Sequence, residues 1–337
     1  MNRTAISLFV LTPIVAAVVW YSLESLLSKD YPRYRITDLG EALFTGHTHT
    51  LDINNLGEIL VYYVNTDQEP VIFIRSATGS TKELEISISQ IPAFRPEGFN
   101  DHGQILGEIN SATGGAWTAI YDPASGTVRS LGPLGGSNGY ATSLNNRGEV
   151  VGLSMQTWTA PESGFVWSSS TAKVIVPKAT GVAMAAFYGI NDHGDIVGYQ
   201  VTSRGYPILR SATGTTTTLN TLGYGLSVAM GINNNHQIVG YSGVESLIVR
   251  PVVNLIDGIF SGFTKVKAHR PDRSHAFLWE DGVLMDLNDL IPEDSGWELI
   301  QAHDINDAGE IVGWGNYRGK EHAFLLTPLN APPTDGQ

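Results

Sequence analysis

Short apolar runs alternate with polar turns along most of the chain, and one such combination recurs six times. Each copy begins with an apolar residue and an Asn, which are followed by two variable residues. The next position is usually a Gly, and a polar residue and a short β-branched run come after it. The Asn residues of the six copies are Asn54, Asn100, Asn145, Asn191, Asn233 and Asn306. They are separated by 46, 45, 46, 42 and 73 residues, a period typical of propeller blades and solenoid units. The pattern therefore indicates a repeat protein.

The conserved positions within each copy have a physical reason. Asn at the first position of a type I turn accepts a hydrogen bond from the backbone two residues further on, and Gly at the fourth position adopts the left-handed conformation. Asn191-Asp192-His193-Gly194 is a complete example, whereas the fifth copy has His236 in place of the Gly. Each copy therefore predicts a tight β-hairpin.

Two further apolar runs follow each predicted hairpin. The first is rich in aromatic residues, as at residues 275–279, and the second comes after a short polar turn, as at residues 283–287. Four successive short strands joined by turns are the pattern of an antiparallel propeller blade. The fold class is therefore predicted to be all-β, a six-bladed β-propeller over residues 30–328.

The sixth copy ends near Pro328 after only three predicted strands. Residues 34–40 match the fourth strands of other copies, and we expect residues 35–39 to pair with residues 322–326. An N-terminal strand that completes the last blade closes the ring and removes an exposed sheet edge. The alternative at this stage is an open solenoid, because the repeat pattern does not report curvature.

The tripeptide His-Ala-Phe occurs at His275-Ala276-Phe277 and again at His322-Ala323-Phe324. The motif Ile-Asn-x-x-Gly-x-Ile-Val-Gly is complete at residues 190–198 and 305–313. In these motifs the chain resembles the HAF-repeat family over about residues 34–328. The resemblance implies an extracellular, propeller-like repeat protein and supplies no catalytic residues. Because the two tripeptide histidines recur at one strand position, we expect them to pack or hydrogen-bond within their blades.

The N-terminal segment has a different character from the repeats. Residues 5–23 are a run of 19 residues without a charge, and a helix of that length spans most of a bilayer core of roughly 30 Å. Residues 1–29 are therefore predicted to hold an apolar helix. A signal-anchor is favoured over a cleaved signal peptide, because no Ala-x-Ala site follows the apolar core. The expected location is extracytoplasmic, with the chain anchored to a membrane. Residues 329–337 are expected to be a flexible tail.

Charge and cysteine content exclude several kinds of site. The formal net charge is −13, from 20 basic and 33 acidic residues, and such a protein repels a nucleic-acid backbone. The chain has no cysteine, so disulfides and thiolate metal sites are excluded. No cofactor-binding fingerprint stands out, and no cofactor is expected.

Two sequence features have the residue types of a metal site. Asp52-Ile53-Asn54 and Asp304-Ile305-Asn306 resemble the start of a calcium loop, but no Glu follows at the twelfth position and the turn already explains the Asn. His47, His49 and His303 lie in repeats that ring closure makes neighbours. Their offsets from the turn Asn differ, however, so exposed or hydrogen-bonded histidines are favoured over a metal cluster.

One interval breaks the repeat. The 73-residue spacing exceeds 45 by 28 residues, and the excess falls at residues 243–270, between the second and third strands of blade five. The insertion is apolar and locally basic, and we expect it to lie over the rim opposite the tight turns and to contact a partner. The candidate partner-binding residues are Arg250, Phe260, Phe263, Lys265, Lys267 and Arg270.

The sequence thus favours an extracytoplasmic binding scaffold with a protein or glycan partner. The alternative is a hydrolase or lyase that acts on glycans or peptides at the open rim, with catalytic residues that the sequence does not identify. Buried carboxylates and histidines with shifted pKa values around the propeller axis would favour the enzyme. An exposed apolar patch at the insertion would favour the scaffold.

Overall fold

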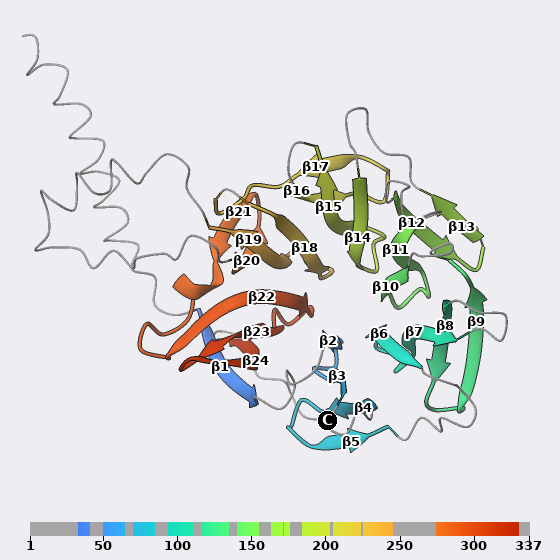
Figure 1. Cartoon of the computed structure of the whole chain (residues 1–337), viewed down its shortest axis with the longest axis horizontal. Coiled ribbons are helices and arrows are strands. Elements are labelled where there is room, and N and C mark those ends of the chain that lie inside the picture. Colours follow the sequence, from blue (N-terminus) through green and yellow to red (C-terminus); the bar gives the residue numbers. More distant parts are fainter. Residues whose placement is uncertain are drawn as a thin grey trace, which may run out of the picture.

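The computed structural model of the protein is a ring of sheets around a central axis (Figure 1). It describes residues 33–40, 50–64, 70–84, 94–110, 116–134, 140–154, 163–170, 172–175, 184–202, 205–223, 225–244 and 274–329. The predicted N-terminal helix, most of the insertion and all but the first residue of the predicted tail lie outside these residues. Within the described part of the chain, no helix is long and apolar enough to cross a membrane.

Six antiparallel sheets of four strands each form the blades, so the described residues confirm the predicted six-bladed propeller. Blades one to three are β2 (Thr50–Ile53), β3 (Ile59–Val64), β4 (Pro70–Arg75), β5 (Thr81–Glu83); β6 (Arg95–Phe99), β7 (Ile105–Asn110), β8 (Ala116–Asp122), β9 (Thr127–Gly132); and β10 (Tyr140–Leu144), β11 (Val150–Ser154), β12 (Ser163–Ser168), β13 (Ala172–Ile175). Blades four and five are β14 (Met184–Ile190), β15 (Ile196–Val201), β16 (Gly205–Arg210), β17 (Thr216–Thr218); and β18 (Ser227–Ile232), β19 (Ile238–Gly243), β20 (Ser274–Glu280), β21 (Val283–Asp286).

Blade six has the order β22 (Trp297–Ile305), β23 (Ile311–Tyr317), β24 (Lys320–Pro328) and β1 (Tyr34–Gly40). The predicted ring closure is therefore confirmed: β1 pairs antiparallel with β24, with Ile36 opposite Leu326 and Asp38 opposite Phe324. In Figure 1 the first strand of each blade lies nearest the axis and the fourth lies at the outer edge. The closing strand thus covers what would otherwise be an open sheet edge.

The two tripeptide histidines bind aspartates on the neighbouring fourth strand. His275 on β20 contacts Asp286 on β21 at 2.6 Å, and His322 on β24 contacts Asp38 on β1 at 2.9 Å. Burial lowers the pKa of His275, but the hydrogen bond to Asp286 and the negative charges of nearby carboxylates together raise it above its ordinary value. The predicted hydrogen-bonding role within the blade is confirmed, and in blade six this bond also fixes the closing strand.

The repeated turns have the predicted geometry. In the first copy Gly57 donates its N–H to the Asn54 carbonyl at 3.0 Å, and the Asn54 side-chain oxygen accepts the N–H of Leu56 at 3.1 Å. Gly57 has φ 71°, and the residue in the same position of the fifth copy, His236, has φ 60°. A side chain therefore occupies a left-handed position there that the other copies fill with Gly.

Two sets of hydrogen bonds join these turns from blade to blade. In the first, the turn Asn donates its side-chain N–H to the backbone oxygen of the turn Asn in the next blade, as Asn145 does to Asn191 at 3.0 Å. In the second, the residue after the turn Asn donates its backbone N–H to the side-chain oxygen of its counterpart, at 2.7 to 2.9 Å. We call these six residues the Asx ring: Asn55, Asp101, Asn146, Asp192, Asn234 and Asp307.

The Asx ring alternates strictly between amide and carboxylate. Asn146, for example, donates its side-chain N–H to Asp101 at 2.7 Å and to Asp192 at 2.9 Å. Each carboxylate therefore lies between amide donors and never beside another carboxylate of the ring. Such hydrogen bonds to a charged group are worth roughly 1.5–3 kcal/mol each. The last of the backbone bonds, from Asp307 to Asn55, joins blade six to blade one.

Asn146→Asp should destabilise the protein by about 2–4 kcal/mol near neutral pH, because it removes two donors and places three carboxylates in a row. The loss should shrink at about pH 4, where a protonated carboxyl can donate again. Urea denaturation at both pH values measures the effect. Asn220→Asp adds the same charge at an exposed position outside the ring and serves as the control. Equal stability of the two variants near neutral pH would contradict the role given to the Asx ring.

Candidate functional site in the axial pocket

β-Bulges place one extra residue on the innermost strand of five blades. In each of these blades the pairing register between the first and second strands shifts close to the repeat turn, which leaves one residue unpaired there, and β22 has a second shift further from the turn, at Ile300. The bulge residues are Glu97, Thr142, Tyr188, Met230 and His303. All five line one pocket on the propeller axis, so a repeated backbone irregularity brings five different side chains to one site.

Glycines on the second strands allow these bulges to form. A β-carbon at Gly198 would lie 2.0 Å from the carbonyl oxygen of Ala186, and one at Gly240 would lie equally close to that of Val228. No side chain fits at such a distance, so the bulged first strand can approach the second strand only at Gly.

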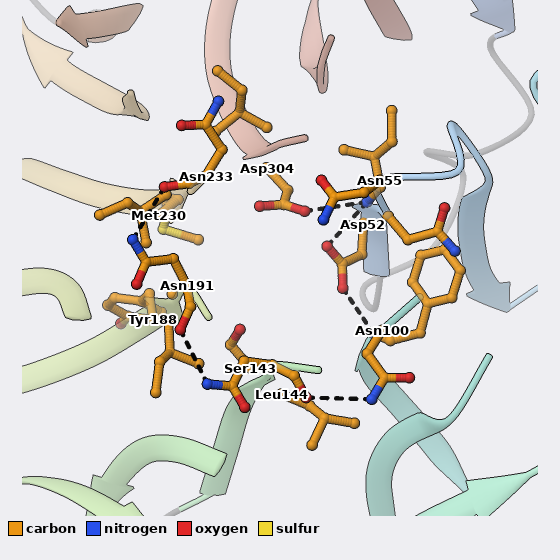
Figure 2. A pocket seen from close by; sticks show the side chains of 18 of the residues that line it. Asp52, Asn55, Asn100, Ser143, Leu144, Tyr188, Asn191, Met230, Asn233 and Asp304 are labelled. Atoms are coloured by element: carbon orange, nitrogen blue, oxygen red, sulfur yellow. Dashed lines mark hydrogen bonds between the residues drawn. The ribbon is translucent and has the colours of Figure 1, made fainter. Parts of the chain in front are cut away.

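The pocket has a volume of about 240 Å³ (Figure 2), somewhat smaller than a typical ligand cavity of roughly 300–1,000 Å³. Residues of the turns and the Asx ring form part of its wall, together with the bulge residues and Asp52 and Asp304. Six of the lining residues are acidic, and none of the described residues that line it is Lys or Arg. The pocket is therefore polar and acidic.

Asp52 of blade one and Asp304 of blade six form a carboxyl pair in the pocket wall. They are hydrogen-bonded to each other, and Figure 2 shows both at the edge of the pocket. Asp52 accepts the backbone N–H of Ile53 at 3.0 Å and that of Phe99 at 2.8 Å, and Asp304 accepts the N–H of Ile53 at 3.2 Å. The pair therefore joins blades six, one and two.

Small residues in the neighbouring blades leave room for the carboxyl pair. A β-carbon on Gly98 would lie 2.9 Å from a carboxylate oxygen of Asp52, and one on Gly231 would lie 2.6 Å from an oxygen of Asp304. Both glycines occupy the repeat position equivalent to the aspartates themselves, two residues before the turn Asn. The pair is thus accommodated by Gly in the adjoining blades.

The hydrogen bond between the two carboxyl groups requires that one of them carries a proton. Burial raises the pKa of both Asp52 and Asp304, and the charge of Asp52 raises that of Asp304 further, well above its usual value. Asp304 is consequently the protonated member and donates to Asp52. Burial also raises the pKa of Glu97 to about 7, against the opposing effect of Arg95, whose guanidinium lies 2.8 Å away.

The candidate residues from the sequence fall into three groups. Asp52 and Asp304 meet across the closure of the ring, but their oxygens accept backbone N–H groups and face each other, which does not suit a calcium ligand set. His303 lines the axial pocket. His47, His49 and the six candidate residues of the insertion, Arg250, Phe260, Phe263, Lys265, Lys267 and Arg270, lie outside the described residues.

Sequence reasoning missed the Asx ring and, apart from His303, the bulge residues of the axial pocket. The ring had a readable signal, because the residue after the turn Asn alternates between Asn and Asp through all six copies. The bulge residues also stand at a fixed place, three residues before the turn Asn. Their types differ in every blade, so no recurring letter marks them.

Comparisons with known proteins add only distant structural similarity. No protein-family model matches the chain, so the HAF-repeat resemblance remains a prediction. No curated protein matches it either. TolB from Acinetobacter baumannii is similar at 10% identity and a TM-score of 0.46, over 84% of this chain and 54% of that one. An acylaminoacyl peptidase from Pyrococcus horikoshii is similar at 13% identity and 0.45, over 86% and 47%.

A third similar structure is a putative TolB from Agrobacterium tumefaciens, with 12% identity, a TM-score of 0.47, and coverage of 83% of this chain and 90% of that one. The chain spans about half the length of the first two proteins. These similarities concern the fold alone, and the blade count comes from the strand order of this chain.

Asp304→Asn and Asp52→Asn should change the pH dependence of stability in different ways. Because the folded-state pKa of Asp304 is raised, its contribution to stability is present at low pH and is lost as pH rises through that pKa. Asp304→Asn keeps a donor to Asp52 and an acceptor for Ile53, so it should abolish the loss of stability that occurs as pH rises from the ordinary Asp pKa toward the raised pKa of Asp304. Asp52→Asn instead turns an amide N–H₂ toward an N–H donor and should cost about 1–3 kcal/mol at every pH.

Urea denaturation between about pH 5 and pH 9 separates the two variants. Asp281→Asn, at an exposed turn, is the control and should follow the wild-type profile. An Asp304→Asn variant that still loses stability with rising pH as the wild type does would refute the shared proton.

Proposed function

We propose that the protein is an extracytoplasmic binding scaffold whose ligand site is the axial pocket, and that the ligand is compact and either hydroxyl-rich or cationic. The extracytoplasmic location and membrane attachment rest on the apolar residues 5–23 and on the HAF-repeat resemblance. A partner-binding role of the insertion rests on its apolar and basic composition. These parts of the proposal are independent of the pocket.

The observation that carries the proposal is the variety of side chains on one repeated backbone position. The five bulges supply a carboxyl, a hydroxyl, a phenol, a thioether and an imidazole around one axis. A purely structural channel would need only side chains that fill space. Few precisely placed polar groups on a rigid scaffold are instead typical of sites that bind small molecules.

The charge of the pocket favours one class of ligand. Its acidic residues, with no Lys or Arg among the described lining residues, repel anions and attract amines. The carboxyl and backbone oxygens of the wall accept hydrogen bonds from hydroxyl or ammonium groups. Tyr188 stacks on Tyr199 with ring centroids 5.9 Å apart, so its orientation is fixed beside the pocket. An aromatic ring held in this way suits a sugar or an amine.

Three hexoses of equal ring size and different charge test the pocket. We expect glucosamine to bind more tightly than glucose and glucuronate not to bind, as measured by isothermal titration calorimetry. Tyr188→Ala should weaken the binding of glucosamine about tenfold, because it removes the contact with the aromatic ring. A tenfold change in Kd corresponds to roughly 1.4 kcal/mol of binding free energy. Val283→Ser, on the exposed outer strand of blade five, is the matched control and should bind like wild type. Glucuronate binding as tight as that of glucosamine would refute the proposed selectivity.

The hydrolase alternative is favoured by one specific feature, the carboxyl pair with one protonated and one ionised member, as in aspartic proteases. Because the two carboxyl groups are hydrogen-bonded, the distance between them is shorter than the roughly 5 Å or more that separates the two carboxylates of glycosidases. Peptides rather than glycans are therefore the substrate class that the pair suits. Both oxygens of Asp52 already accept backbone N–H groups, however, which favours the binding scaffold. Peptide hydrolysis that is lost in Asp304→Asn would reverse this preference.

A further inference from the structure

Two departures from the repeat and one residue of a variable turn position meet between blades four and five. His236 stands where the other copies have Gly, Asp195 stands where they have Glu or Gln, and His193 follows Asp192 in the turn of blade four. The metal-ligating atoms of these three residues all lie within 4.8 Å of one another. None of the three lines the axial pocket, so this cluster is separate from the site described above.

Asp195 does not make the hydrogen bond that the residue at the same repeat position makes in the other blades. In other copies this residue accepts the side-chain N–H of the turn Asn, as Glu149 does from Asn145 at 2.8 Å. Asp195 is one methylene shorter, and its carboxylate instead accepts the N–H of Ala212 at 2.9 Å and contacts Nε2 of His236 at 2.9 Å. Asp195 is buried, and its carboxylate is therefore oriented toward the blade junction.

His236 is held in an unfavourable backbone conformation. Its φ of 60° is in the left-handed region, where the other copies have Gly at φ between 71° and 88°. A residue with a β-carbon is disfavoured there, and such strain tends to be kept at functional positions. The imidazole lies parallel to that of His193, with centroids 5.5 Å apart and an interplanar angle of 4°. Both imidazoles are exposed, so an ion can reach them from solvent.

We propose that His193, Asp195 and His236 bind a divalent transition-metal ion, with Zn²⁺ as the best match. Two imidazoles and one carboxylate form a three-ligand set with a fourth position open to water. Ligand atoms around a tetrahedral Zn²⁺ ion are roughly 3.3 Å apart at bond lengths of about 2.0–2.1 Å. Rotation of the exposed imidazoles closes the remaining distance, and the ion replaces the proton between His236 and Asp195.

The bound ion would join blades four and five at their turns. The surroundings are not purely acidic, since the Arg147 guanidinium lies near Gly194 and pairs with Glu149. Imidazole ligands select Zn²⁺, Ni²⁺ or Cu²⁺ over Mg²⁺ and Ca²⁺. The expected consequence is a metal-dependent rise in stability, because an ion that binds only the folded state stabilises it.

The test is calorimetric titration of the full chain, without a polyhistidine tag, with Zn²⁺ and with Mg²⁺. We expect Zn²⁺ to bind, Mg²⁺ to give no signal, and His193→Ala and His236→Gly each to weaken Zn²⁺ binding at least about tenfold. His236→Gly restores the repeat residue, so without metal it should be at least as stable as wild type. His102→Ala is the matched control, because His102 has the turn position of His193 in blade two and is exposed.

Absence of Zn²⁺ binding to the wild type would overturn the proposal. So would Zn²⁺ affinity that is unchanged in His236→Gly and His193→Ala, because the ion would then bind elsewhere, for example at His47, His49 or His303. Equal losses in His102→Ala and His193→Ala would also contradict it, since they would indicate non-specific binding to surface histidines.

Discussion

Hydrogen bonds between the turns of neighbouring blades are the interaction on which the rest of this propeller depends. In blades two to six the turn Asn donates its side-chain N–H to the next blade, and in all six the following residue donates its backbone N–H to the Asx side chain of the next blade, so that the ring returns from Asp307 to Asn55. Strict alternation of amide and carboxylate keeps the ring carboxylates apart, and Asp101 and Asp192 each accept an amide N–H from both sides. Such alternation closes without a mismatch only when the number of blades is even, and six satisfies this condition.

The same repeat that closes the ring also creates the candidate site. The bulge on the first strand needs a Gly on the second strand, and it directs an unpaired residue to the axis. Because the backbone holds this position constant, its side chain can vary from blade to blade without loss of the fold. Within one repeat, the turn Asn is constant and stabilises the fold. The residue three positions before it varies and supplies the side chains of the candidate binding site.

Much of the fold could be predicted from the sequence because its determinants are local. The turn Asn, the Gly at positive φ and the apolar strands recur with one period, and the missing strand of the last copy pointed to residues 34–40. The carboxyl pair could not be predicted as a pair, since Asp52 and Asp304 meet only when the ring closes. The two aspartates were noted only for their resemblance to the start of a calcium loop, which the missing Glu already disfavoured, and spacing does not show that the Asp52 oxygens accept backbone N–H groups.

The bulges escaped prediction for a related reason. One extra residue in a strand changes the register with its neighbour, yet it leaves the apolar pattern of a short strand almost unaltered. His236 was noticed as a departure from the repeat, but its meaning depends on Asp195 in the preceding blade, a contact across 41 residues. The positions that differ between copies carry the chemistry, and they are the ones that a repeat pattern describes least well.

The most direct measurement of the central claim is methyl NMR of the five methionines during titration with glucosamine. Met230 lines the axial pocket, whereas Met285 lies on the outer strand of blade five. If the axial pocket is the ligand site, the Met230 signal, assigned with Met230→Leu, shifts and saturates while the Met285 signal stays constant. A saturable shift of Met285 with no change at Met230 would place the ligand elsewhere and contradict the account.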